Sequence, residues 1–196
     1  MASLTRRSGK REEVQRAVLR ATESLLAGGE SFSDLPVGRI AGEAGISRTA
    51  FYFYFRDKRD LLMRLTDEVA GLLYAEADGW WSGDTDLRTA LQRVVVLYRD
   101  HAALLRAVVE TAAYDEPVAA FWRALVGRFA EATEARIEVD NAAETAFMLV
   151  WMTERSCYQR LVQGEDPVDP AFLSALVELW ERGTQPARTP RSRTRA

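Results

Sequence analysis

A short stretch of the chain gathers side chains that can recognise a polyanion. Ser47, Arg48, Thr49 and Tyr52 lie within six consecutive positions, and at the start of a helix they would face outward together. A guanidinium group can donate two hydrogen bonds to a guanine, while a threonine can offer its hydroxyl group or contact a thymine methyl group. The chemistry predicted for this stretch is the recognition of double-stranded DNA.

The surrounding residues, 37–55, have the spacing of a helix-turn-helix. Gly45 stands at the turn, where a backbone with positive φ favours glycine, and Ser47 can cap the second helix with its hydroxyl group. The apolar positions that would hold the two helices together are Ile40, Ala41, Ala44, Ile46, Phe51 and Tyr54. Two unrelated short helices around a glycine can share part of this pattern, but six compatible positions favour the helix-turn-helix.

Over residues 11–65 the chain resembles the TetR family of transcriptional regulators, and the segment AGISRTAFYFYFRDKRDLL carries the resemblance. In this family an Ala-Gly-hydrophobic-Ser turn leads into an aromatic-rich recognition helix, and Phe-x-x-Lys-x-x-Leu opens the fourth helix. The resemblance implies that the DNA-contacting residues are Ser47, Arg48, Thr49, Tyr52, Tyr54 and Lys58, the last of them on a phosphate. Thr49 stands where many relatives carry glycine, and Tyr54 where many carry histidine, so the operator sequence is not implied.

The whole chain is predicted to be all-α, because segments of helical period lie between sparse glycines and prolines. The expected helices cover about 11–27, 37–45, 48–55, 58–78, 85–99, 102–114, 117–138, 142–163 and 170–182. Asp57 is the expected cap of the fourth helix, and 79–84 is expected to be a loop although it contains two tryptophans. The first three helices would form the helix-turn-helix domain and the others a C-terminal helical domain.

The expected domains are a flexible basic arm over 1–10, the helix-turn-helix domain over 11–56, a ligand-binding and dimerisation domain over 57–183 and a disordered basic tail over 184–196. The net charge is +3 over residues 1–60, −10 over 61–183 and +4 from 184 onward. A basic first third on an acidic body suits a chain of which one end approaches a polyanion. An excess of +3 is also small enough to arise by chance.

The C-terminal domain is rich in aromatic residues at helical spacing, which can form either a plain core or the wall of a ligand cavity. The segments LRTALQRVVVLYRDHAALLRA, PVAAFW, MTERSCYQRLVQGE and ALVELW are similar to the sensor half of the EthR-like branch of the TetR family. This similarity covers about 85–182 and implies a tunnel for a small hydrophobic or amphipathic ligand, with Thr153 as a hydrogen-bonding group. The tunnel residues that it implies are Leu87, Leu91, Val94, Tyr98, Trp122, Val126, Phe129, Val150, Thr153 and Trp180.

The segment 146–152 is apolar on every side of its helix, so both faces of that helix need a cover. The simplest second cover is another copy of the chain, in a four-helix interface built from the last two helices of each subunit. The residues expected in this interface are Met148, Phe172, Leu173, Leu176 and Leu179. The alternative is a monomer in which this helix is simply central.

Several other classes of protein are not expected. A single cysteine excludes an internal disulfide, and with one histidine it argues against a zinc cage. The longest apolar run has seven residues, whereas a membrane-spanning helix needs roughly 20, and no secretory signal is recognisable. No phosphate-binding glycine loop, GxSxG elbow or HExxH motif occurs. We therefore expect a cytoplasmic protein with no catalytic residues, metal or cofactor, in which Cys157 is an inert core thiol.

These observations favour a homodimeric, ligand-responsive repressor that binds a pseudo-palindromic double-stranded DNA operator. The small apolar ligand would bind in the C-terminal domain, shift the fourth helix and release the DNA. Two alternatives stay open: a helical protein that sequesters a lipid or drug and has little DNA-binding role, and an enzyme that uses the cavity.

Overall fold

The computed structural model describes residues 2–164 and 167–185, with side chains described from residue 11 onward in those ranges. The described residues form α-helices and one π-helical turn, with no strand among them, which confirms the all-α fold class. The α-helices are α1 (Ala2–Ala27), α2 (Val37–Glu43), α3 (Arg48–Tyr54), α4 (Lys58–Trp81), α5 (Leu87–Asp100), α6 (Ala102–Ala112), α7 (Glu116–Glu134), α8 (Ala142–Cys157) and α9 (Pro170–Thr184). The π-helical turn, η1 (Tyr158–Gln163), continues directly from α8.

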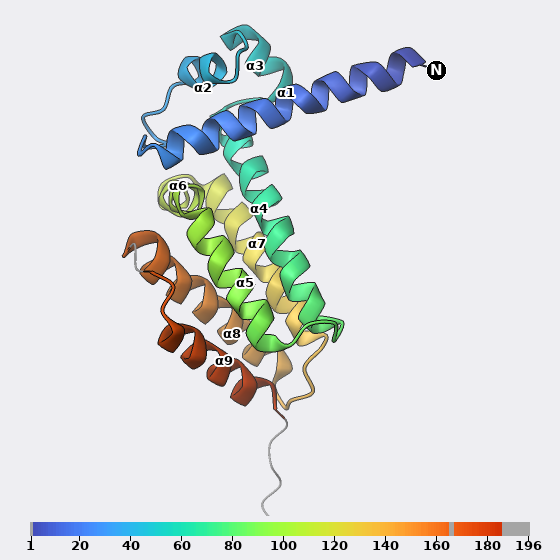
Figure 1. Ribbon diagram of the computed structural model, residues 1–196, viewed down its shortest axis with the longest axis vertical. Coiled ribbons are helices and arrows are strands. Elements are labelled where there is room, and N and C mark those ends of the chain that lie inside the picture. The colour runs from blue at the N-terminus through green and yellow to red at the C-terminus, as the bar shows by residue number, and fades with distance from the viewer. Residues whose placement is uncertain (1, 165–166, 186–196) are drawn as a thin grey trace, which may run out of the picture.

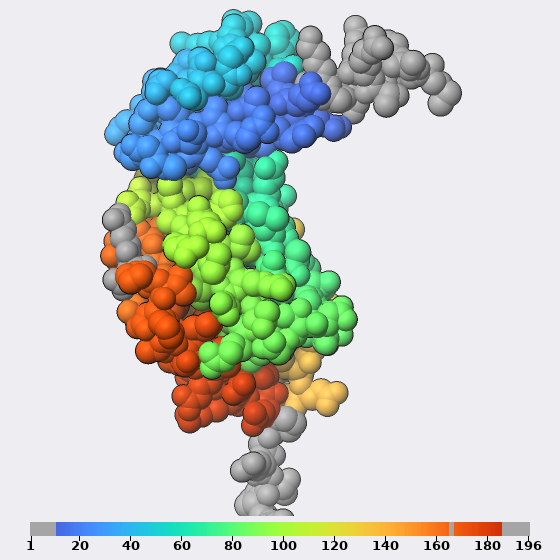
Figure 2. All heavy atoms as spheres, in the orientation of Figure 1, coloured from blue at the N-terminus to red at the C-terminus, as the bar shows by residue number. Residues whose placement is uncertain are grey.

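The molecule is elongated, with α1, α2 and α3 at one end and the remaining helices in a body below them (Figure 1). Helix α4 starts beside the N-terminal helices and runs down the length of the body, next to α5 and α7 (Figure 1). In the space-filling view the N-terminal helices form a lobe that caps the body (Figure 2). Helix α4 is therefore the element that links the N-terminal helices to the body.

The turn between α2 and α3 has the geometry that the sequence predicts. Gly45 has a φ of +70°, and the Ile46 amide donates to the Ala41 carbonyl at 2.9 Å. The Ser47 hydroxyl oxygen accepts a hydrogen bond from the Ala50 amide at 3.0 Å, which confirms Ser47 as the cap of α3. These contacts fix how α3 leaves the turn.

Burial of aromatic side chains holds α3 against the N-terminal domain. Phe51 and Phe55 are almost completely buried, with their ring centroids 5.2 Å apart. Ile40 and Ala41 of α2 are buried in the same core, as expected for the two helices of the motif. The opposite face of α3 is left without protein neighbours to cover it.

Helix α4 begins where the sequence predicts and ends later. The Asp57 carboxylate accepts a hydrogen bond from the Asp60 amide at 2.7 Å, which confirms Asp57 as its cap. The predicted loop over 79–84 is wrong, because α4 continues to Trp81. Gly79 permits this: the Thr85 amide donates to its carbonyl at 2.8 Å, and a Cβ atom at Gly79 would lie only 3.0 Å from the Thr85 hydroxyl oxygen. The chain can thus turn back closely after an uninterrupted helix.

Other helix ends also differ from the expectation. Helix α1 begins at Ala2, nine residues before the expected start, and α7 ends four residues earlier than expected, shortly before Asn141 adopts a φ of +77°. The segment expected as one helix over 142–163 changes to π-helical geometry at Tyr158. Residues 186–196 of the predicted basic tail lie outside the described residues.

An ion pair and a histidine–carboxylate contact connect the N-terminal helices and the start of α4 to the body. The Arg59 Nε and Nη2 atoms donate to Asp115 Oδ2 at 2.8 and 2.6 Å, and this hydrogen bonding lowers the pKa of Asp115. His101 Nδ1, between α5 and α6, lies 3.3 Å from Glu23 Oε1 of α1. The start of α4 and the C-terminal part of α1 are therefore each held to a helix end of the body.

The turn geometry predicts opposite effects for one substitution at two neighbouring glycines. Gly45→Ala should lower the free energy of unfolding by about 1–2 kcal/mol, because a side chain disfavours the left-handed backbone. Gly42→Ala should leave it unchanged or raise it by about 0.5–1 kcal/mol, since Gly42 is helical and a Cβ atom there would meet no neighbour. Urea unfolding at one protein concentration measures both effects, and equal effects would contradict the assigned turn.

Candidate nucleic-acid interface and internal pocket

The outer face of α3 presents polar and aromatic side chains to solvent. Arg48 and Thr49 are exposed in its first turn, and 47% of the Tyr52 surface is accessible. Tyr54 is half-buried. The structure thus brings Arg48, Thr49 and Tyr52 together on one accessible face, while contact with DNA remains a prediction for each of them.

Phe53 is the residue of this face that sequence reasoning missed. It is 76% exposed, more than any other described large apolar side chain. An exposed phenylalanine next to Tyr52 in sequence gives α3 an apolar group that can contact thymine methyl groups. The signal was present in the run FYFYF, because a seven-residue helix that buries Phe51 on one side must leave some of the other rings outside.

Two of the predicted DNA contacts have structural partners. Ser47 uses its hydroxyl oxygen to cap α3. The Lys58 ammonium donates to the carbonyl oxygens of Phe32, Ser33 and Leu35 at 2.6, 2.8 and 3.1 Å. Burial lowers the pKa of Lys58, and the nearby Asp34 carboxylate opposes this shift. With all three donors engaged, Lys58 holds the loop before α2 against α4, and its contact with a phosphate remains a prediction.

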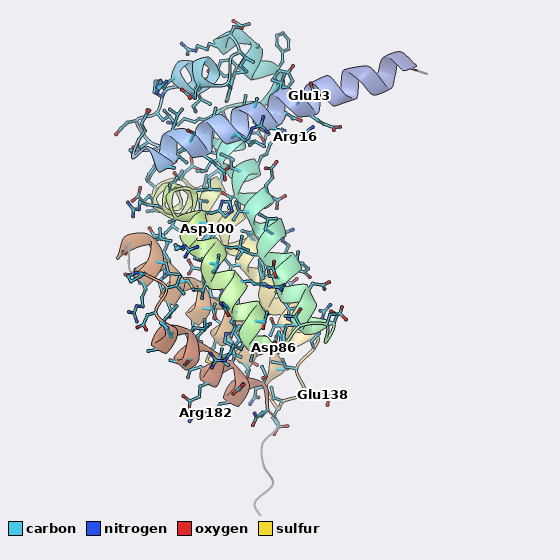
Figure 3. The ribbon with its side chains drawn as sticks, viewed as in Figure 1. Glu13, Arg16, Asp86, Asp100, Glu138 and Arg182 are labelled. Carbon is cyan, nitrogen blue, oxygen red and sulfur yellow. The ribbon has the colours of Figure 1, made fainter. Side chains whose placement is uncertain are left out.

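Two arginines near α3 have acidic partners. Arg56 follows α3 and has a largely exposed side chain. Its Nη2 atom lies 3.7 Å from Oδ1 of the buried Asp60 carboxylate. Arg39 of α2 pairs with Glu30 and Glu43. The acidic groups Asp86 and Glu138 lie toward the far end of the body, whereas Asp100 lies at its upper end and Glu13 on α1 (Figure 3). The net charge of +3 over residues 1–60 and of −10 over 61–183 places the basic excess at the end of the molecule that carries α3.

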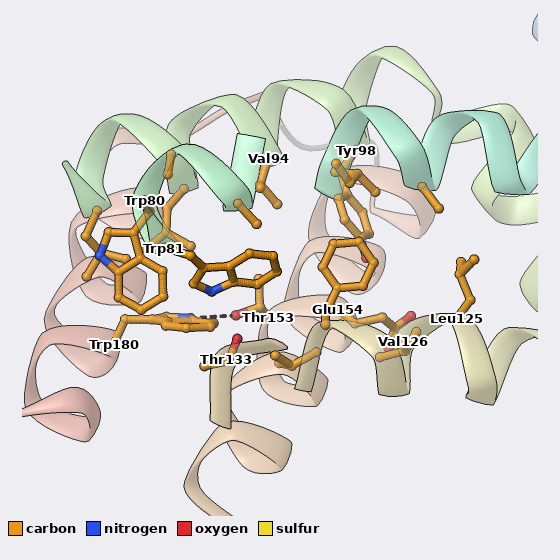
Figure 4. A pocket seen from close by; sticks show the side chains of 18 of the residues that line it. Trp80, Trp81, Val94, Tyr98, Leu125, Val126, Thr133, Thr153, Glu154 and Trp180 are labelled. Carbon is orange, nitrogen blue, oxygen red and sulfur yellow. Dashed lines mark hydrogen bonds between the residues drawn. The ribbon is translucent and has the colours of Figure 1, made fainter. Parts of the chain in front are cut away.

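An internal pocket lies in the body between α4, α5, α7, α8 and α9, with a cavity volume of about 100 Å³. All ten residues named as tunnel candidates line it: Leu87, Leu91, Val94, Tyr98, Trp122, Val126, Phe129, Val150, Thr153 and Trp180. Figure 4 shows Trp80, Trp81 and Trp180 gathered at one end of the pocket, with Tyr98 and Glu154 toward the other end. The binding of a ligand by these residues remains a prediction.

The α4 side of the pocket was missed. Thr66, Ala70, Leu73 and Ala77 recur at helical spacing along one face of α4 and line the cavity. These small and medium side chains end in the two tryptophans at the C-terminal end of α4. The helical spacing of these four residues is present in the sequence. Assigning Trp80 and Trp81 to a loop hid the continuation of this face of α4 into the pocket.

Thr153 is already satisfied within the protein. Its hydroxyl donates to the Leu149 carbonyl at 2.8 Å and accepts from Trp180 Nε1 at 2.8 Å. The hydrogen-bonding group predicted at this position is therefore engaged. The neighbouring Glu154 is also buried against the pocket and was not among the predicted residues.

The surface of α8 and α9 differs in part from the predicted dimer interface. Met148 and Leu179 are exposed, and Phe172 is half-buried below the guanidinium of Arg160. Leu173 and Leu176 are buried inside the protomer, and their place in a dimer interface remains a prediction. Phe147, which the sequence reasoning left out, is exposed beside Met148.

Other reactive groups give no sign of a catalytic or metal centre in the described part of the chain. No group of three or more His, Cys, Asp or Glu side chains there could hold a metal ion. Burial raises the pKa of the Cys157 thiol to about 12, as a core position implies. Among the described helices, none combines the length and the apolar character that crossing a membrane requires.

Comparison with known proteins identifies relatives over both halves of the chain. Residues 18–65 match the family model for the bacterial regulatory proteins of the tetR family. The chain is 31% identical to the HTH-type transcriptional regulator EthR of Mycobacterium tuberculosis, over 84% of this chain and 83% of that protein. It is 28% identical, with the same coverage, to EthR of Mycolicibacterium smegmatis.

Solved structures share the fold. A TetR-family transcriptional regulator from Rhodococcus sp. gives a TM-score of 0.66 at 21% identity, over 89% of this chain and 100% of that chain. The regulator LfrR from Mycobacterium smegmatis, solved in complex with proflavine, gives a TM-score of 0.57 at 21% identity, over 89% of this chain and 97% of that chain.

Proposed function

The chain belongs to the TetR family of DNA-binding transcriptional regulators, and from that membership we propose that it is a repressor which leaves its operator when a small molecule fills the internal pocket. The single observation that carries the proposal is that α4 joins two features of the molecule. The exposed recognition face of α3 lies near the N-terminal end of α4, and a largely apolar cavity lies along the rest of α4.

The recognition face consists of Arg48, Thr49, Tyr52 and Phe53. Arg48 donates to a guanine or a phosphate, Thr49 and Tyr52 donate to the backbone or to base edges, and Phe53 contacts thymine methyl groups. Exposure of these side chains supports this assignment, because protein neighbours leave them accessible to a duplex.

Two copies of the chain read the operator as a dimer. Exposed apolar side chains on α8 and α9 support this, since Phe147, Met148 and Leu179 would otherwise remain in water. The pairing makes an isologous interface, in which each subunit offers the same surface. Two recognition helices then enter major grooves about 34–36 Å apart, one helical turn of the duplex.

Ligand binding acts through α4. A molecule in the cavity contacts the face of α4 that carries Thr66, Ala70 and Leu73, while the first turn of the same helix holds the loop before α2 through Lys58. A fold that can hold a small molecule is illustrated by LfrR with proflavine. A coupling free energy of about 1–3 kcal/mol changes DNA affinity roughly 5–150-fold, provided that the ligand prefers the conformation that does not bind DNA.

The recognition face predicts a selective loss of DNA binding. Arg48→Ala should weaken binding to the protein's own promoter fragment by about 10–100-fold, because a good side-chain contact to a base contributes about 1–3 kcal/mol. Arg93→Ala removes an exposed arginine of α5 that pairs with Glu76, and it should leave the affinity unchanged. Fluorescence anisotropy at several salt concentrations, with circular dichroism to establish folding, measures both.

Equal affinities of the wild type and Arg48→Ala for the promoter fragment would contradict the assigned recognition face. An affinity for the promoter fragment that does not change with salt concentration would contradict the proposed repressor function, because phosphate contacts make DNA affinity salt-dependent. That result would favour the ligand-sequestering alternative.

The interface predicts a change of oligomeric state. Leu179→Asp should convert the dimer to a monomer, because it places a charge in a self-complementary apolar contact. Leu72→Asp is the matched control, since Leu179 and Leu72 are 48% and 51% exposed and only Leu179 lies on α9. Analytical ultracentrifugation of the wild type and both variants measures their oligomeric states. A Leu179→Asp variant that stays dimeric, or a wild type that is monomeric, would contradict the proposed interface.

A further inference from the structure

The wall of the pocket contains polar atoms that the protein leaves unpaired. Among the described residues, the buried side-chain atoms without a hydrogen-bond partner are Trp81 Nε1, Trp122 Nε1, Thr133 Oγ1 and both carboxyl oxygens of Glu154. All four side chains line the internal pocket. Because buried polar groups in proteins are nearly always hydrogen-bonded, their concentration around one cavity indicates that a ligand supplies missing partners. The two carboxyl oxygens of Glu154 are the acceptors that a donor group of the ligand can satisfy.

Among these groups, the Glu154 carboxyl group has the most to gain from a hydrogen-bond or ion-pair partner, because both of its oxygens are buried and unpaired. Its side chain is 3% exposed, and the nearest cationic group is Arg155 Nε, 3.6 Å from Oε2, which is beyond hydrogen-bond distance. Burial raises the pKa of Glu154, and the Arg155 charge opposes this shift. The Arg155 side chain is half-exposed, so it leaves the pocket side of the carboxyl group unpaired.

The surroundings of Glu154 favour a positive charge. No lysine, arginine or histidine lines the pocket, so an anionic ligand would meet a buried carboxyl group and no compensating cation. The aromatic rings on the wall, Tyr98, Trp122 and Phe129 among them, present faces that attract cations. Figure 4 shows Glu154 and Tyr98 in the same part of the pocket.

We propose that the pocket binds a small amphipathic organic cation, a protonated amine on an apolar body, and that Glu154 binds its nitrogen. The proposal rests on the ligand-responsive function above and names the chemical class of its ligand. The apolar body lies along the α4 face and the tryptophans, while the ammonium group donates hydrogen bonds to the Glu154 carboxylate. Such charge-assisted bonds are among the stronger interactions of a buried site.

Side chains at the tryptophan end must move to admit this ligand. The cavity of about 100 Å³ is smaller than the roughly 300–1,000 Å³ of ordinary ligand sites. Trp81 and Phe129 are only half-buried there, and both pack edge-on against the exposed Tyr74, at centroid distances of 4.9 and 5.4 Å. Rotation of these rings opens the pocket toward solvent and leaves Glu154 in place at the inner end.

The test compares three probes of equal chain length: octylamine, 1-octanol and octanoate at pH 7. Quenching of the pocket tryptophans and isothermal titration calorimetry give their affinities for the full-length protein. Octylamine should bind about 10-fold or more tightly than 1-octanol, because hydrogen bonds to a charged group contribute that much. Octanoate should bind most weakly of the three.

Glu154→Gln, which preserves the shape of the side chain, should remove the preference for octylamine over 1-octanol and keep 1-octanol binding. Retained binding of 1-octanol shows that the variant has folded with its pocket intact. Glu144→Gln makes the same change on the exposed side of α8 and should leave all three affinities unchanged. The proposal is overturned if Glu154→Gln binds octylamine as the wild type does, or if octanoate equals octylamine in the wild type.

The same probes separate this proposal from the repressor function. If octylamine binds through Glu154 and the promoter fragment stays bound, the ligand class stands and ligand-induced release is wrong. If octylamine releases the promoter fragment from Glu154→Gln and from the wild type at equal concentrations, release stands and the role of Glu154 is wrong.

Discussion

The continuity of α4 is the constraint on which the other features of the molecule depend. Its first turn is capped by Asp57 and holds the loop before α2 through the Lys58 ammonium group. Its middle lines the pocket, and its end places Trp80 and Trp81 at the far end of the cavity. Because α4 contacts both the loop before α2 and the pocket, it is the element through which the proposed ligand response would move the recognition face.

Contacts at the junction make this coupling specific. Arg59, one residue after Lys58, binds Asp115 at the start of α7, and Glu23 pairs with His101 at the start of α6. A shift of α4 relative to the body would break these contacts or move both partners of each contact together. These contacts hold the N-terminal domain in one orientation on the body. In the proposed mechanism, occupancy of the pocket selects between orientations by a modest difference in free energy.

The sequence predicts best where local stereochemistry decides the structure. The positive φ of Gly45, the Ser47 cap and the Asp57 cap follow from the residues themselves. The tunnel residues of α5, α7, α8 and α9 could also be named, because the resemblance to relatives supplied a register that periodicity alone does not.

What could not be predicted depends on tertiary contacts. Whether Gly79 ends a helix or lies within one depends on its approach to Thr85, and whether Leu176 faces a partner depends on which side α9 turns to α8. The sequence places Glu154 beside Arg155, where either side chain could form a buried or inter-subunit ion pair, and only the packing of α8 shows that Glu154 is buried at the pocket. Lys58 has the residue type of a phosphate ligand, but nearby carbonyl groups occupy its donors.

The coupling through α4 is tested most directly by the distance between the two recognition domains of the dimer. A spin label at Gly42→Cys reports this distance by double electron–electron resonance, while the native Cys157 is buried and should stay unlabelled. Octylamine should change the mean label–label distance by more than about 2 Å, since helix displacements of that order accompany switching in allosteric proteins. An unchanged distance in a sample whose tryptophan quenching proves that octylamine is bound would contradict the account.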